Sequence, residues 1–184
     1  MSIPPGTYRL GPADGTLSVR TERTGAAAKA GHNLLLHVTA WDATLTAAED
    51  PAATMLELAA DGASLRVIEG TGGMQSLGDD DKADIQKTID DDVLKRQDIL
   101  FRSTSVTPAV GGSGLRVEGD LTLRGTTRPL AFDVAVDGDQ VGATAIIKQS
   151  DWKIKPYSAL FGALKVVDEV EVSIDATLPS AQSV

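Results

Sequence analysis

Two histidines are the side chains of this sequence best suited to metal binding or acid–base chemistry. His32 and His37 are five residues apart on a segment that passes from a loop into a strand, and Asp42 follows them closely. Imidazole and carboxylate groups are frequent metal ligands, but a site usually needs three or more of them. A metal- or haem-associated or enzymatic barrel that uses His32, His37 and a carboxylate is therefore one alternative. In the other, both histidines only make local hydrogen bonds.

Other residue types that catalyse reactions occur here without the spacing that catalysis needs. Ser103 and Ser105 lie on an expected strand, without the sharp turn that exposes a nucleophilic serine. The aspartates at 79–81 and 90–92 are typical of a solvated helix surface. The glycines at 70–73 are not followed by Gly-Lys-Ser/Thr, so they do not predict a phosphate-binding loop. We therefore predict a protein that is not an enzyme, with no catalytic residues, no metal site and no cofactor.

Composition narrows the choice of partners. The chain has 184 residues, a net charge of −9 and no cysteine, which excludes disulfides and thiolate chemistry. An acidic chain is repelled by phosphate backbones and by anionic lipid headgroups. We therefore expect no nucleic-acid partner and no stable membrane insertion. Residues 1–6 lack the basic and apolar runs of a signal peptide, so we expect a cytoplasmic location.

Alternation of apolar and polar residues with a period of two runs through most of the chain. Leu121 and Leu123 share one face of their run, and Phe132 and Val134 share one face of the next. This alternation is typical of strands with one buried and one solvated face. Such runs, which we expect to form about eight strands, occur at 7–10, 15–23, 34–46, 54–60, 64–69, 99–106, 115–124, 128–137, 141–149 and 170–178.

One segment departs from the β pattern and predicts a helix at about 79–95. Its residues Ile85, Ile89 and Val93 are four apart, so they form one stripe of a helix. With no linker in view, we predict a single domain over 1–184, with its core at 6–178. The fold class is all-β: an eight-stranded antiparallel up-and-down barrel with one helix inserted between strands.

An eight-stranded barrel is wide enough inside for side chains or for one small ligand. Aromatic residues are only 4% of the chain, so a cavity would have aliphatic walls that suit an alkyl or prenyl chain. Alternatively, the side chains fill the barrel, which then acts as an interaction module. If the barrel is hollow, the residues that we expect to line it or its mouth are Leu36, Val38, Leu58, Leu121, Leu123, Phe132, Val134, Ile147, Trp152 and Phe161.

Four segments resemble the YceI-like family. They are ILFRSTSV at 99–106, VEGDLTLRGTTRPL at 117–130, QSDWKIKPY at 149–157 and GALKVVDEV at 162–170. The resemblance extends over about 6–178, and it implies a lipocalin-like barrel whose helix is a lid beside the mouth. It also implies non-catalytic binding or carriage of an apolar long-chain ligand in the barrel. That ligand would be a polyisoprenoid, an isoprenoid quinone or another lipid, and a homodimer is left open.

Overall fold

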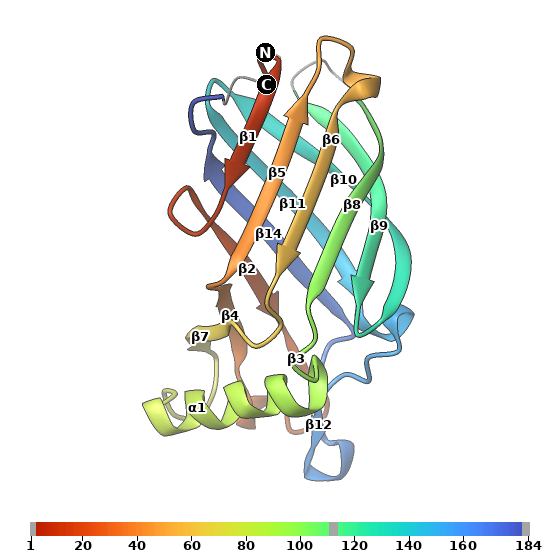
Figure 1. Ribbon diagram of the computed structural model, residues 1–184. Helices are drawn as coiled ribbons and strands as arrows, with labels where there is room; N and C mark the ends of the chain where they lie inside the picture. Colours follow the sequence, from red (N-terminus) through yellow and green to blue (C-terminus); the bar gives the residue numbers. More distant parts are fainter. Residues whose placement is uncertain (1–2, 111–113, 182–184) are drawn as a thin grey trace.

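Antiparallel β-strands make up most of this computed structural model, which describes residues 3–110 and 114–181 (Figure 1). The strands of the large sheet are β1 (Gly6–Leu10), β2 (Gly15–Thr21), β4 (Asn33–Val38), β5 (Trp41–Ala47), β6 (Met55–Ala60), β7 (Leu65–Thr71), β8 (Ile99–Pro108), β9 (Leu115–Leu123), β10 (Thr126–Asp137), β11 (Gln140–Lys148) and β14 (Glu169–Thr177). A small second sheet consists of β3 (Arg23–Thr24), β12 (Ser158–Ala159) and β13 (Leu164–Val166).

Helical segments are short and lie outside the sheets. The longest is α1 (Asp79–Thr88), which continues without a break into the π-helix η3 (Ile89–Val93). Single 3-10 turns occur at η1 (Ala28–Ala30), η2 (Pro51–Ala53), η4 (Gln149–Trp152) and η5 (Leu160–Gly162). In the part of the chain that the structure describes, no helix is both long and apolar enough to cross a membrane.

The strand pairings close the large sheet into a barrel. β1 pairs with β5 and β2 pairs with β4, so β1 and β2 together flank the long strand made of β4 and β5. β6 and β7 flank its other side. From β6 the antiparallel pairing continues through β8, β9, β10, β11 and β14, and it returns to β2. Counting each interrupted strand once gives a closed ring of eight, which confirms the predicted antiparallel barrel.

The sequence prediction missed the interruptions. We expected one strand over 34–46, but the strand breaks at Thr39 and Ala40. The buried hydroxyl of Ser64 stabilises this break, since it accepts a hydrogen bond from the Ala40 backbone N at 3.1 Å and donates one to the Asp61 carbonyl at 2.8 Å. A side chain thus replaces a ladder bond that the bend removes, and the exposed Ala40 backbone N–H keeps a partner.

The inserted helix begins where the sequence predicted it. The Gly78 backbone N donates to Asp81 Oδ2 at 2.9 Å, and the three aspartates of the first turn lie where the helix dipole favours negative charge. The helical stretch ends at Val93, short of the expected residue 95, because Lys95 and Arg96 adopt left-handed backbone angles, with φ of 54° and 55°. The helix lies across one end of the barrel, which we call the helix end (Figure 1).

The segment between β11 and β14 also lies at the helix end. We had predicted its strands to stop at 149 and resume at 170, and the structure adds the short strands β12 and β13 between them. β13 pairs with β12 on one side and with β3 on the other. The hairpin formed by β12, η5 and β13 extends away from the barrel, beyond α1 (Figure 1).

Candidate functional site: an apolar cavity inside the barrel

A cavity of about 290 Å³ occupies the interior of the barrel. Its lining comes from strands around the ring and, at the helix end, from η3. Among the described residues that line it, the polar side chains are Thr21, Thr144, Ser173 and Gln149, and none is Asp, Glu, Lys, Arg or His. The cavity can therefore bind an apolar molecule by burial of surface.

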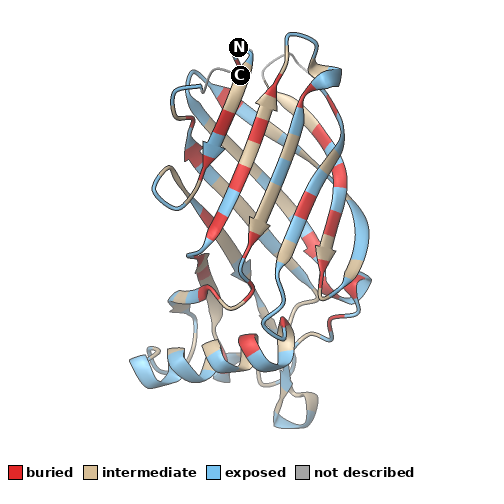
Figure 2. Cartoon of the chain, viewed as in Figure 1, coloured by how far each residue is buried: buried red, intermediate tan, exposed pale blue. Residues whose placement is uncertain are grey.

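The cavity is lined by strands all around the ring, but inward positions differ in how tightly they are packed. On β8 and β9, Val106 and Val117 are tightly packed, at 1% and 2% exposed, and do not line the cavity. On β10, β11 and β14 several inward positions, such as Leu130, Ala143 and Val172, line the cavity and are only half-buried. Figure 2 shows this difference: the nearer strands β8 and β9 have red bands, whereas β11 and β14 behind them have tan stretches. The side chains at the half-buried positions have no atoms packed against them on the side that faces the cavity.

Two of the four polar residues of the lining, Gln149 and Thr21, lie at the helix end. Gln149 is 8% exposed, and its Nε2 donates to the Val167 carbonyl at 3.1 Å. The hydroxyl of Thr21, at the end of β2, is buried and has no hydrogen-bond partner among the described residues. A buried hydroxyl without a partner is uncommon in native proteins.

The helix closes this end of the cavity with apolar side chains. Ile89, Val93 and Leu94 line the cavity, and Leu94 is 8% exposed. Because η3 is a π-helix, these residues follow one another with a wider turn than in an α-helix. The position of the helix therefore decides how the cavity communicates with solvent at the helix end.

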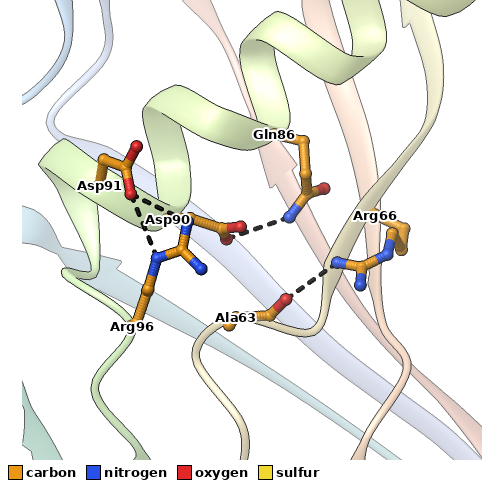
Figure 3. A network of polar contacts seen from close by, with 6 residues as sticks. All are labelled: Ala63, Arg66, Gln86, Asp90, Asp91 and Arg96. Atoms are coloured by element: carbon orange, nitrogen blue, oxygen red, sulfur yellow. Dashed lines mark hydrogen bonds and ion pairs between the residues drawn. The ribbon is translucent and has the colours of Figure 1, made fainter.

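Polar contacts around η3 are local (Figure 3). Gln86 Nε2 donates to Asp90 Oδ1 at 3.1 Å, and Arg96 Nη2 pairs with Asp91 Oδ1 at 3.0 Å. Across the gap, Arg66 Nη1 donates to the Ala63 carbonyl at 2.9 Å and so stays on the barrel side. None of these three contacts joins the helix to the barrel wall. Farther along, Lys82 Nζ of α1 donates to the Ile68 carbonyl of β7 at 3.2 Å, whereas at η3 the apolar side chains of Ile89 and Val93 attach the helix to the core.

Eight of the ten predicted lining residues face the cavity. They are Leu36, Val38, Leu58, Leu121, Leu123, Phe132, Val134 and Ile147. Their inward direction follows from the alternation of apolar residues on their strands. The sequence list omitted Val170, Val172 and Ile174 of β14 and Ile89 and Val93 of η3. The period-two pattern of the last strand and the four-residue spacing of the helix were the signals for them.

Trp152 and Phe161 do not line the cavity, in contrast to the prediction. Trp152 is 4% exposed and closes the packing of the helix end, where its Nε1 donates to the Leu121 carbonyl at 2.9 Å. Phe161 is at the tip of the hairpin and is fully exposed, at 114% of its reference area. The prediction assumed that aromatic residues close in sequence lie at the same place, but the chain leaves the barrel between these two residues.

The two histidines lie outside the cavity lining. His32 Nε2 lies 2.7 Å from the Gln75 carbonyl, so its ring connects the start of β4 with the segment before α1. His37 is on β4 opposite Ser18 and Arg66. Within 3–110 and 114–181, no group of three or more His, Asp or Glu side chains is arranged to hold a metal ion. The geometry therefore gives no support to the histidine-based alternative.

Comparison with known proteins places the chain in a family. The YceI-like domain model matches residues 8–178. The crystal structure of Burkholderia cenocepacia BcnA has a TM-score of 0.62 at 17% identity, over 90% of this chain and 96% of that one. A mutant Campylobacter jejuni YceI protein has a TM-score of 0.52 at 14% identity, over 79% and 85%. No curated protein matches. At such identities the structures establish a shared fold, and the domain match shows that the chain belongs to the YceI-like family.

Proposed function

We propose that the protein binds or carries a long apolar ligand of the polyisoprenoid class inside its barrel, without changing it chemically. The observation that supports this most directly is the hollow, aliphatic interior, with a volume of about 290 Å³ and no charged side chain in its described lining. An interior of this kind also argues against the filled barrel. Membership of the YceI-like family adds the ligand class.

Burial of apolar surface is sufficient to hold such a ligand. About 25 cal/mol is gained for each Å² of apolar surface removed from water. One isoprene unit of roughly 100 Å² thus contributes ~2–3 kcal/mol before the cost of ordering the chain. Several units give tight binding with no hydrogen bond, which explains why the sequence has no polar ligand motif.

Cavity size and the position of its polar groups narrow the ligand further. A volume of about 290 Å³ is near the lower end of the ~300–1,000 Å³ typical of small-molecule pockets. It suits a slender chain better than a bulky ring system. The unpartnered Thr21 hydroxyl at the helix end favours a ligand whose polar head, such as a quinone carbonyl, lies at that end.

The test begins with the purified protein. An organic extract is analysed by mass spectrometry for prenyl lipids, and a prenyl quinone is then added while the melting temperature is recorded. At a hundredfold excess over Kd we expect a rise of about 5–10 °C. A quinone without its prenyl tail is the control ligand, and we expect no shift from it. Absence of any co-purifying lipid together with no shift from the prenyl quinone would overturn the proposal.

A pair of variants on one strand tests whether the ligand enters the barrel. Ala143→Phe points into the cavity from β11, where Ala143 lies opposite Val134 and Ile174. It fills the hollow, so we expect loss of the ligand-induced shift and a folded protein. Ile146→Phe, on the same strand but 54% exposed on the outside, is the matched control and keeps the shift. Equal shifts in both variants would show that the ligand binds elsewhere.

Three expectations from the sequence stay predictions alongside this proposal. They are the absence of catalysis, a cytoplasmic location and a homodimer as an open possibility. The first is checked with the same prenyl quinone. Recovery of the unchanged compound after prolonged incubation with the protein is the expected result.

A further inference from the structure

We infer that the hairpin formed by β12, η5 and β13 is a reversible anchor that places the helix end of the barrel on an anionic phospholipid bilayer. Such contact would bring the cavity to the place where long apolar molecules reside. The purpose of the contact rests on the proposed function, but the contact itself has an independent test. The inference depends on the shape of the hairpin tip, its local charge and its position.

The tip of the hairpin presents apolar side chains to solvent. Phe161 and Leu160 are 114% and 56% exposed, and Tyr157 at the base of the hairpin is 45% exposed. Leu160, Phe161 and Gly162 all have positive φ, at 51°, 54° and 88°. Large non-glycine residues rarely adopt this region. The tight turn they form keeps both apolar side chains outward, so the tip has the shape of a small apolar wedge.

Basic residues surround this wedge in an otherwise acidic protein. Residues 152–167 contain three lysines and no acidic residue, and residues 23–31 contain one arginine and one lysine and again no acidic residue. Strand pairing joins the two segments, since Lys165 lies opposite Thr24. Lys165 is also next to the turn, because its Nζ lies 4.0 Å from the position that a Cβ on Gly162 would take. The protein thus has a locally positive region at the hairpin, although its overall net charge is −9.

These two features together match the surface of an anionic bilayer. Aromatic and aliphatic side chains partition into the interfacial layer, and lysines are attracted by anionic headgroups. One weak signal gives only marginal membrane binding, whereas two signals together give a useful affinity. An apolar tip without the lysines would suit a protein groove equally well. The local positive charge is what favours lipid as the occupant.

The position of the hairpin makes the contact reversible. Figure 1 shows that the hairpin extends beyond α1, so its tip reaches a flat surface before the helix does. The first turn of α1 contains Asp79, Asp80 and Asp81, which an anionic surface repels. The tip therefore enters the interface while the acidic helix opposes deeper insertion. This agrees with the expectation of no stable membrane insertion.

Vesicle binding tests the anchor. Because the chain has no cysteine, Ser158→Cys places a single environment-sensitive fluorophore beside the tip, and Val110→Cys places one at an apolar position on the opposite end, 108% exposed. Phosphatidylcholine vesicles are compared with vesicles that also contain phosphatidylglycerol. We expect a blue shift from residue 158 only, and only with the anionic vesicles. An equal response from both labels, or none from residue 158, would overturn the inference.

Variants separate the two parts of the anchor. Leu160→Ser with Phe161→Ser removes the wedge and should weaken binding by at least about tenfold, whereas Val110→Ser should leave it unchanged. Replacing Lys153, Lys155 and Lys165 by Gln should weaken it by roughly a hundredfold, since each basic residue contributes about fivefold. Lys82→Gln with Lys87→Gln and Lys95→Gln, on and beside the helix, is the matched control. Equal losses in the two lysine sets would show that general charge, and not this hairpin, causes binding.

Two further results distinguish the possible failures. Ligand-induced stabilisation without vesicle binding overturns the anchor and leaves the proposed function standing. Vesicle binding without ligand-induced stabilisation overturns the proposed function and leaves the anchor standing. If the label on residue 158 shifts without vesicles as the protein concentration rises, and light scattering shows a dimer, then the tip binds a second copy of the chain and the lipid assignment is wrong.

Discussion

Ser150 and Asp168 join the two ends of the segment that contains the projecting hairpin. The Ser150 backbone N donates to Asp168 Oδ1 at 2.8 Å, and its hydroxyl donates to Asp168 Oδ2 at 2.5 Å. The hydrogen bond from the Ser150 hydroxyl holds the pKa of Asp168 below its ordinary value of 3.8, with smaller help from the Ser150 backbone and Lys148. A carboxylate with a lowered pKa stabilises the folded state only while it is ionised.

Ser150→Ala should raise the pKa of Asp168 toward its ordinary value of 3.8, as measured by NMR titration of the carboxyl. Because the folded pKa is lowered, the contribution to stability is present above the unfolded pKa and is lost as pH falls through the folded pKa. The stability difference between wild type and variant should thus be largest at neutral pH and shrink in strong acid. Lys148→Gln, the control, should move the pKa less. A difference independent of pH would contradict this account.

Gly73 lies so close to His32 that any larger residue at 73 would require the imidazole to move. A Cβ on Gly73 would lie 2.0 Å from His32 Nε2. Gly73→Ala should therefore displace the imidazole from the Gln75 carbonyl and lower the melting temperature. In the double variant with His32→Ala the collision is gone, so the loss should be smaller than the sum of the two single losses.

Gly11→Ala is the matched control for this pair, since the nearest atom to its added Cβ is the Trp41 carbonyl oxygen at an ordinary 3.5 Å. We expect little change from it. The metal content of His32→Ala is measured in the same series and should equal that of the wild type. A drop in metal content would revive the histidine-based alternative, and additive losses would show that the close contact has no energetic effect.

The barrel could be predicted from the sequence because its signal is local and repeated. Alternation decides which side chains of a strand share a face, and one apolar face per strand is enough to predict eight of the lining residues. The break at Thr39 and Ala40 has no such signal, since it depends on a hydrogen bond that the Ala40 backbone N donates to the hydroxyl of Ser64, far along the chain. The directions of Trp152 and Phe161 depend on left-handed angles at Lys153, Leu160 and Phe161, which propensity does not predict for these residue types.

Apolar packing, and not ion pairing, should hold the helix against the barrel. Leu94 is 8% exposed and lines the cavity, so Leu94→Ala should lower the free energy of unfolding by about 2–3 kcal/mol or expose the cavity. Both members of the pair formed by Arg96 and Asp91 are exposed, at 61% and 44%. Arg96→Ala should therefore change the free energy of unfolding by less than about 0.5 kcal/mol. Urea denaturation measures both values, and a larger loss from Arg96→Ala would reverse this ranking.

A tightly packed position and a cavity-lining position should respond differently to the same truncation. Val117 on β9 is 2% exposed and packs against neighbours on all sides, whereas Val172 on β14 lines the cavity and is half-buried. Val117→Ala should thus lower the free energy of unfolding by about 2 kcal/mol, through lost burial and a new void. Val172→Ala removes atoms that already face empty space, so the loss should stay under about 1 kcal/mol. Urea denaturation without ligand gives these values.

With a prenyl ligand bound, Val172 gains neighbours and the penalty of Val172→Ala should increase, while that of Val117→Ala stays constant. Equal penalties without ligand would mean that Val172 is packed as tightly as Val117.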